Sequence, residues 1–162
     1  MRLTFIKGSG KYDALHIERD GVVLEPIACP KQGIIPHDMV HYAVESTLAH
    51  RGFLSLVANG SPASFTTKGG DIENATERLV ETFQAEMWGG RVAIADLVAT
   101  YEHACEASGH AVVPVTAGDV EAIRARIDVL TAQWDKVPVR GSLSVTFPTG
   151  GACDILPGTA SA

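Results

Sequence analysis

Features that mark several classes of protein are scarce or missing in this chain of 162 residues. Lys and Arg number 13 against 19 Asp and Glu, which gives a net charge of −6, and no run of basic residues occurs. This argues against a nucleic-acid partner and against attachment to anionic lipid, because both need cations that neutralise phosphates. The three cysteines form no Cys-x-x-Cys pair, so the sequence predicts no disulfide framework and a reducing compartment.

Long hydrophobic runs and targeting signals are missing as well. The apolar stretch 92–98 contains Asp96 and is too short to span a bilayer, and the N-terminal residues reach Gly8 before a signal-peptide apolar region can build. We therefore expect a soluble cytoplasmic protein without a membrane partner. Apolar residues make up 46% and charged residues 20%, the balance of a globular chain. We expect a single domain over residues 1–147 and a flexible tail over 148–162, where small residues dominate.

Period-two alternation and turn residues predict strands near both ends of the sequence. Strands are expected at 3–6, 12–18, 22–24 and 142–147. Asp20-Gly21 favours a tight hairpin turn between the second and third of these. We expect the last strand to join the N-terminal meander, which gives about four antiparallel strands.

Helical periodicity fills the sequence between these strands. Helices are expected at 36–50, 71–88, 91–107 and from 116 to about 134. The segment 53–58 fits a short helix or a strand equally well, and the stretch 59–70 reads as a loop. The predicted fold class is α+β, with about four strands packed against about four helices on one face.

One segment of the first predicted helix carries residues of the types that bind metals or take part in catalysis. His37, His41 and Glu45 are each separated by four residues, so they form a row along one side of the helix, beside its apolar positions. Two imidazoles at this spacing can bind one divalent ion together. Glu45 is then a third ligand, a hydrogen-bond partner of His41, or a general base in catalysis.

A metal site here needs a further ligand from another helix. Glu86 is the first candidate, because it borders the apolar stripe of its predicted helix, and His103 is the second. The expected cofactor is zinc or another divalent transition metal, held by His37, His41 and Glu86, with Glu45 as the candidate catalytic residue. The alternative is that both histidines are structural, half-buried at a helix edge and bonded to backbone carbonyls.

Two resemblances involve this motif. Pro36-His37-Asp38-x-x-His41-x-x-x-Glu45, followed by Trp134 and the strand 142–147, resembles a small bacterial family of uncharacterised sequences, which implies no activity. The core His37-Asp38-x-x-His41 is also similar to the zinc-binding motif of a family of coenzyme Q biosynthesis proteins. That second resemblance implies zinc at the two histidines.

Two functional hypotheses follow from these patterns. In the first, the protein binds a divalent metal and acts as a hydrolase or lyase on a small molecule. In the second, it is a non-catalytic interaction or structural module, such as a homodimer, in which His37 and His41 have structural roles. The second rests on the lack of any complete catalytic motif in the sequence.

Overall fold

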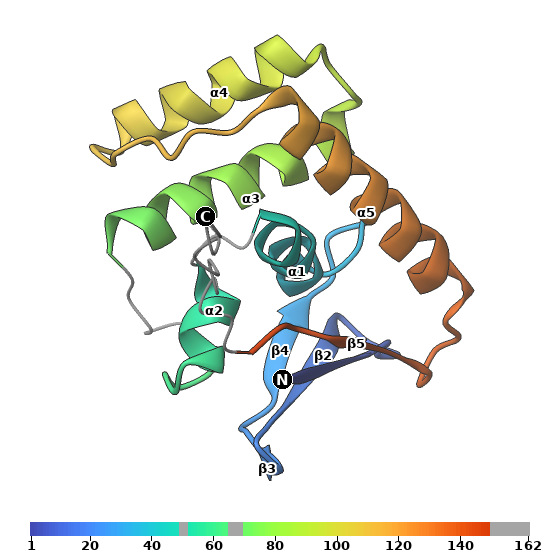
Figure 1. The fold of residues 1–162 in the computed structure, drawn as a ribbon. Coiled ribbons are helices and arrows are strands. Elements are labelled where there is room, and N and C mark those ends of the chain that lie inside the picture. Colours follow the sequence, from blue (N-terminus) through green and yellow to red (C-terminus); the bar gives the residue numbers. More distant parts are fainter. Residues whose placement is uncertain (49–51, 65–69, 150–162) are drawn as a thin grey trace, which may run out of the picture.

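A computed structural model describes residues 1–48, 52–64 and 70–149, and within them it contains five strands and five helices. The α+β class is confirmed, and Figure 1 shows the arrangement. The elements in chain order are β1 (Arg2–Ile6), β2 (Tyr12–Arg19), β3 (Val22–Val23), β4 (Ile27–Pro30), α1 (His37–Leu48), α2 (Phe53–Ala58), α3 (Asp71–Gly89), α4 (Ile94–Ala107), α5 (Ala117–Lys136) and β5 (Ser142–Thr146).

The strands form one antiparallel sheet in the order β3-β2-β1-β5, and β4 also pairs with β2. β5 lies beside β1, with Leu143 opposite Phe5, so the last strand joins the N-terminal meander as predicted. Asp20 and Gly21 both have positive φ, 53° and 76°, the geometry of the tight turn expected there. Strand β4 is not among the predicted strands. It ends at Pro30, which is tolerated because the strand lies at the edge of the sheet.

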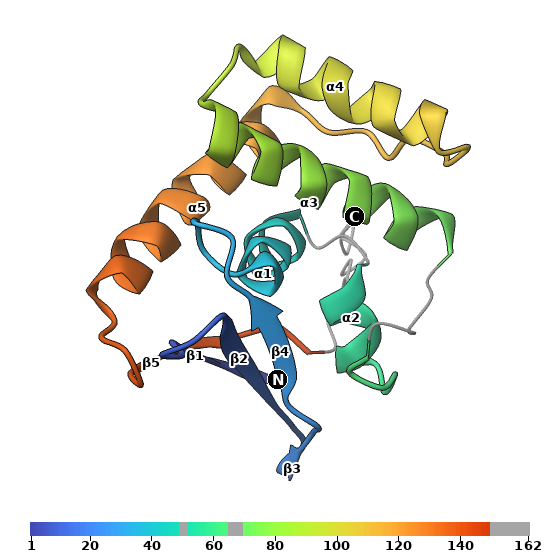
Figure 2. The ribbon, with the colours of Figure 1, turned by 180° about the vertical axis from the view of Figure 1, so that it is seen from behind.

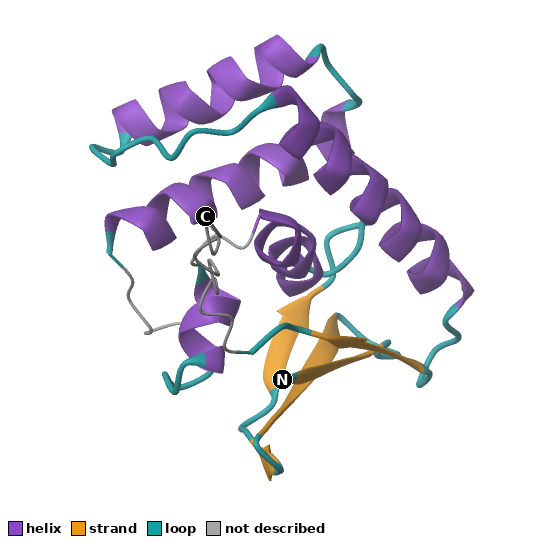
Figure 3. Ribbon diagram, in the orientation of Figure 1, coloured by secondary structure: helices purple, strands orange, loops and turns teal. Residues whose placement is uncertain are grey.

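One face of the sheet is buried and the other is polar. The buried side chains alternate along three strands: Leu3, Phe5, Leu15, Ile17, Ile27 and Cys29. Their neighbours on the opposite face include His16, which is exposed. Figure 3 shows all the helices on one side of the sheet, so the core lies between them and the buried face.

Helix α1 is the centre of the helical layer. It contacts α2, α3 and α5, and α4 packs farther out against α3 (Figures 1 and 2). Pro36 precedes its first residue, and the Pro36 carbonyl accepts hydrogen bonds from the amides of Met39 and Val40. Eight consecutive residues, 38–45, are buried, polar ones included. A buried polar side chain needs hydrogen-bond partners. The buried polar residues of α1 therefore form hydrogen bonds and ion pairs within α1 and with the neighbouring helices.

Several boundaries differ from expectation. The segment 53–58 is a helix. Helix α4 begins at Ile94 instead of Arg91: its N-cap Ala93 has φ −57° and ψ 145°, outside the helical region, and the Val92 carbonyl accepts a hydrogen bond from Arg124. Residues 65–69 of the predicted loop and 150–162 of the predicted tail lie outside the described residues. No helix in the described ranges is long and apolar enough to cross a membrane.

Candidate metal centre

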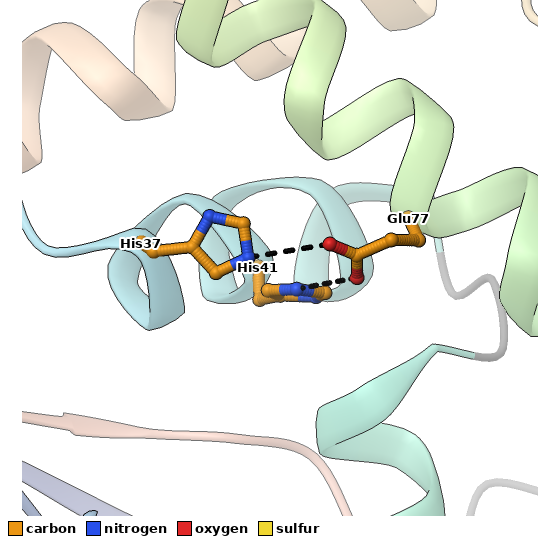
Figure 4. Close-up of side chains that lie close together, drawn as sticks. All are labelled: His37, His41 and Glu77. Atoms are coloured by element: carbon orange, nitrogen blue, oxygen red, sulfur yellow. Dashed lines mark ion pairs between the residues drawn. The ribbon is translucent and has the colours of Figure 1, made fainter. Parts of the chain in front are cut away.

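His37 and His41 stand one turn apart on α1 and face Glu77 on α3 (Figure 4). The His37 Nε2 lies 3.3 Å from Glu77 Oε1, and the His41 Nε2 lies 3.0 Å from Glu77 Oε2. One ligand atom from each residue lies within 4.8 Å of the other two, so the group can hold a metal ion. The row predicted along α1 is therefore real, and its two imidazoles converge on a carboxylate from a second helix.

The other nitrogen of His41 is bonded to Glu45. His41 Nδ1 lies 3.0 Å from Glu45 Oε2, and both side chains are almost fully buried. Glu45 also accepts hydrogen bonds from the backbone N–H of Leu54 at 3.1 Å and from the N–H and hydroxyl of Ser55, each at 2.9 Å. Because both Glu45 oxygens face other donors, we assign the hydrogen of the His41–Glu45 contact to Nδ1 of His41, which donates to Oε2.

Glu45 also serves as the N-terminal cap of α2. The N-cap residue of that helix is Gly52, which has no side chain to accept the first amide hydrogen bonds. Gly52 leaves room for the Glu45 carboxyl group, since an added Cβ would lie 2.5 Å from Glu45 Cδ and 2.8 Å from Thr76 Cγ2. A side chain at position 52 is therefore incompatible with Glu45 in its observed place.

The other nitrogen of His37 ends a chain of hydrogen bonds whose direction is fixed. The Ile35 carbonyl can only accept, so the Gln32 amide donates to it at 2.9 Å and offers its oxygen to the Gln84 amide nitrogen. The Gln84 oxygen then accepts from His37 Nδ1 at 3.0 Å. In neutral His37 this leaves the lone pair on Nε2, the atom that faces Glu77.

Both imidazoles thus turn Nε2 toward the same carboxylate, an arrangement that needs a cation or protons in between. Burial disfavours protonated His41, but the hydrogen bonds and charges of Glu45 and Glu77 outweigh it and raise the pKa of His41 to about 10. Burial acts to raise the pKa of Glu77, but the two histidines lower that pKa well below its usual range. The carboxylates thus favour a bound positive charge at this point.

The structure places the predicted residues as follows. His37 and His41 lie together; Glu45 lies against His41 as its hydrogen-bond partner, one of the three roles considered for it. Glu86, the expected further ligand, is not in the group: its carboxylate accepts from Arg124 Nε at 3.0 Å. His103 is exposed on α4.

Glu77 is not among the ligands predicted from the sequence, because the choice of Glu86 considers only one apolar stripe of α3. That helix contacts both α1 and α4, so it buries two sides. The side toward α1 is partly polar, with Glu77 and Gln84 seven residues apart, and both bond to His37. The sequence signal that could have identified this polar side of α3 is a Glu and a Gln two turns apart on the same helix.

A cleft of about 510 Å³ lies away from the histidines. Its lining includes Lys7, Glu86, Arg124 and Trp134 but none of the three clustered residues. Several of its charged side chains are paired: Glu86 with Arg124 and Arg91 with Asp128, and Lys7 Nζ donates to the Trp134 carbonyl at 2.6 Å. The cleft and the histidine cluster are therefore two separate features of the molecule.

Comparisons with family models, with curated proteins and with solved structures give no match to this chain. The two resemblances of the His37–Glu45 segment accordingly stay predictions, and the site has to be interpreted from its own geometry.

Proposed function

We propose that the protein binds one divalent transition metal ion, zinc in the first instance, through His37 Nε2, His41 Nε2 and the Glu77 carboxylate. The observation that carries the proposal is the direction of the hydrogen bonds behind the histidines. Gln84 accepts from His37 Nδ1 and Glu45 accepts from His41 Nδ1, which turns both Nε2 lone pairs toward Glu77. Histidine ligands of metals are typically held in this way by an acceptor on their other nitrogen.

Two of the distances between the prospective ligand atoms are close to those that one ion requires. With metal–ligand bonds of about 2.0–2.1 Å, two ligand atoms stand about 2.9 Å apart at a right angle and about 3.4 Å apart at the tetrahedral angle. The two nitrogen-to-oxygen distances, 3.3 Å to Glu77 Oε1 and 3.0 Å to Glu77 Oε2, lie in this range. The three ligand atoms lie within 4.8 Å of one another, so an ion that binds all three has to draw them closer together. Two imidazoles and one carboxylate are a ligand set of catalytic zinc sites and also of non-haem iron sites.

The charges of the site favour a divalent ion. Glu45 and Glu77 contribute two negative charges in a largely buried setting, and neutral imidazoles contribute none. A divalent cation brings the sum to zero, which offsets the cost of burying both carboxylates. A monovalent ion leaves one negative charge uncompensated.

The proposed site is accessible from one side, as a catalytic metal site must be. The side chains of His37 and Glu77 are 35% and 33% exposed, whereas His41 is 3% exposed. Three protein ligands leave a position for water or a substrate, and a bound divalent ion supplies Lewis acidity there. This supports a hydrolase or lyase acting on a small molecule. Glu45 has no exposed surface and faces four donors, so we assign it to His41 and not to general-base catalysis.

Replacement of the carboxylate ligand gives the first prediction. Glu77→Gln is expected to weaken zinc binding at least about 100-fold, because loss of a mere hydrogen-bond partner of a ligand already costs 10–100-fold. Glu81→Gln, one turn farther along α3, changes the same chemistry at a carboxylate that is 47% exposed and paired with Arg78. Its affinity is expected to equal that of the wild type. Titration calorimetry measures both, and equal affinities for the two variants would exclude Glu77 as a ligand.

Proton release gives the second prediction. The pKa of His41, raised from 6.5 to about 10, means that the metal-free protein carries a proton there at pH 8. This protonation stabilises the metal-free fold fully below about pH 6.5, and its contribution is lost as the pH rises through about 10. Zinc must displace the proton, so we expect about one proton released per ion at pH 8 and tighter binding, by up to tenfold per unit, as the pH rises from 7 to 9.

Calorimetry in two buffers of different ionisation enthalpy measures that release. A binding heat that is independent of the buffer at pH 8 would show that His41 is already neutral in the metal-free protein. The non-catalytic module, in which the histidines are structural, corresponds to a third result, no zinc binding in either buffer.

A further inference from the structure

Glu45 connects the two histidines to a second helix, α2. We propose that Glu45 is the positioning residue of the metal centre, and that through it metal binding is coupled to the docking of α2. This inference rests on the proposed metal site, and it assigns to Glu45 a role different from that of a ligand or a base. The geometry that carries it is that one buried carboxylate accepts hydrogen bonds both from His41 and from the first turn of α2.

Glu45 determines the orientation of His41. Oε2 of Glu45 accepts from His41 Nδ1 at 3.0 Å, which fixes both the plane of the ring and the nitrogen that carries the hydrogen. The Nε2 atom is thereby presented to Glu77 at 3.0 Å. Without this acceptor, a buried imidazole is free to adopt the other tautomer, which places a hydrogen where the metal has to bind.

Helix α2 depends on the same carboxylate for its N-terminal cap. The helix has six residues, too few to be stable alone, and its N-cap Gly52 provides no side-chain acceptor. Glu45 accepts from the amides of Leu54 and Ser55, the orphan donors of the first turn. An acceptor from another helix therefore replaces the missing cap, and its negative charge also complements the helix dipole.

The contact between Glu45 and the start of α2 is tight enough to transmit a displacement. The Glu45 carboxyl group fills the space over Gly52, where not even a Cβ would fit. The ring of Phe53, the first residue of α2, lies 5.9 Å from the ring of His41 in an edge-on contact. A movement of α2 relative to α1 therefore has to move Glu45 and with it His41.

Coupling in both directions follows from these contacts. A metal ion on Nε2 makes the Nδ1 hydrogen more acidic and strengthens its bond to Glu45, which favours the position that caps α2. By linkage, the factor by which metal binding favours docked α2 equals the factor by which docking of α2 raises metal affinity. We therefore expect metal binding to slow the exchange of the Leu54 and Ser55 amide hydrogens at least about fivefold, relative to those of β2.

The experiment compares wild type, Glu45→Gln and the control Glu81→Gln, first by zinc affinity and then by the visible absorption of the cobalt-substituted proteins. Gln keeps the shape of Glu, but its NH₂ group replaces one of the two oxygens. This group therefore faces hydrogen-bond donors and cannot accept from them. We expect Glu45→Gln to bind one ion per chain with 10–100-fold lower affinity and with altered cobalt bands, which a purely structural role would not move. The control is expected to match the wild type in both.

The outcomes separate this inference from the metal site itself. If the wild type binds one ion and Glu45→Gln matches it in affinity and spectrum, Glu45 is not a positioning residue while the metal site stands. If the wild type binds no ion, both proposals fail. If Glu45→Gln does not fold, amide exchange of the wild type with and without zinc decides: exchange at Leu54 and Ser55 that is unchanged by zinc overturns the coupling.

Discussion

A His37→Ala/His41→Ala double variant is expected to retain less than about a tenth of a metal ion per chain, against about one ion in the wild type. Both nitrogen ligands are removed at once, and a single carboxylate that is one-third exposed does not hold a transition metal at micromolar concentration. Elemental mass spectrometry of tag-free protein after incubation with zinc and gel filtration measures the content. The variant has to show the helical circular dichroism of the wild type for the comparison to count.

The chain offers matched controls for this double variant. His16 on the outer face of the sheet and His103 on α4 are both exposed, and neither belongs to the described cluster. A His16→Ala/His103→Ala variant removes the same number of imidazoles and is expected to bind about one ion per chain. A loss of metal in the control, or full metal content in the His37→Ala/His41→Ala protein, would contradict the assignment of the site to α1.

Glu45→Ala is expected to lower the free energy of unfolding of the metal-free protein by about 3–5 kcal/mol, the cost of breaking a buried charged pair. The substitution removes the acceptor of three buried donors, namely His41 Nδ1 and the amides of Leu54 and Ser55. Each buried donor left unpaired costs about 1–3 kcal/mol. The short helix α2 also loses its cap, so we expect it to detach first.

Urea denaturation followed by circular dichroism measures this loss in the presence of a chelator. Glu81→Ala, at an exposed carboxylate, is expected to remain within about 0.5 kcal/mol of the wild type. A Glu45→Ala protein within about 1 kcal/mol of the wild type would show that the donors find other partners and that the carboxylate contributes little to the fold.

The fold could be predicted in outline because its signals are local. The hairpin needed only Asp20 and Gly21, and the alternation of Leu143 and Val145 marked the last strand. What the sequence left undecided depended on tertiary contacts. The helix at 53–58 is capped by Glu45 from α1, and the propensities of residues 53–58 alone contain no information on that contact.

In the candidate site, too, the local features could be predicted from the sequence and the contacts between helices could not. The spacing of His37 and His41 lies within one helix, so it could be read directly and was correctly interpreted as a row of side chains facing one way. The partner came from another helix, and its choice depended on which side of α3 faces α1. Glu86 borders an apolar stripe but reaches Arg124 on α5, whereas Glu77, one-third exposed, reaches both histidines. Sequence periodicity identifies a buried side of a helix but does not name the element that covers it.

The most direct test of the metal centre is the crystal structure of the zinc-loaded protein with anomalous scattering measured at the zinc edge. The account predicts one strong anomalous peak between α1 and α3, about 2.0–2.2 Å from His37 Nε2, His41 Nε2 and an oxygen of Glu77. It also predicts that His41 Nδ1 remains bonded to Glu45. A peak at other residues, or no peak with the imidazoles still paired directly with Glu77, would contradict it.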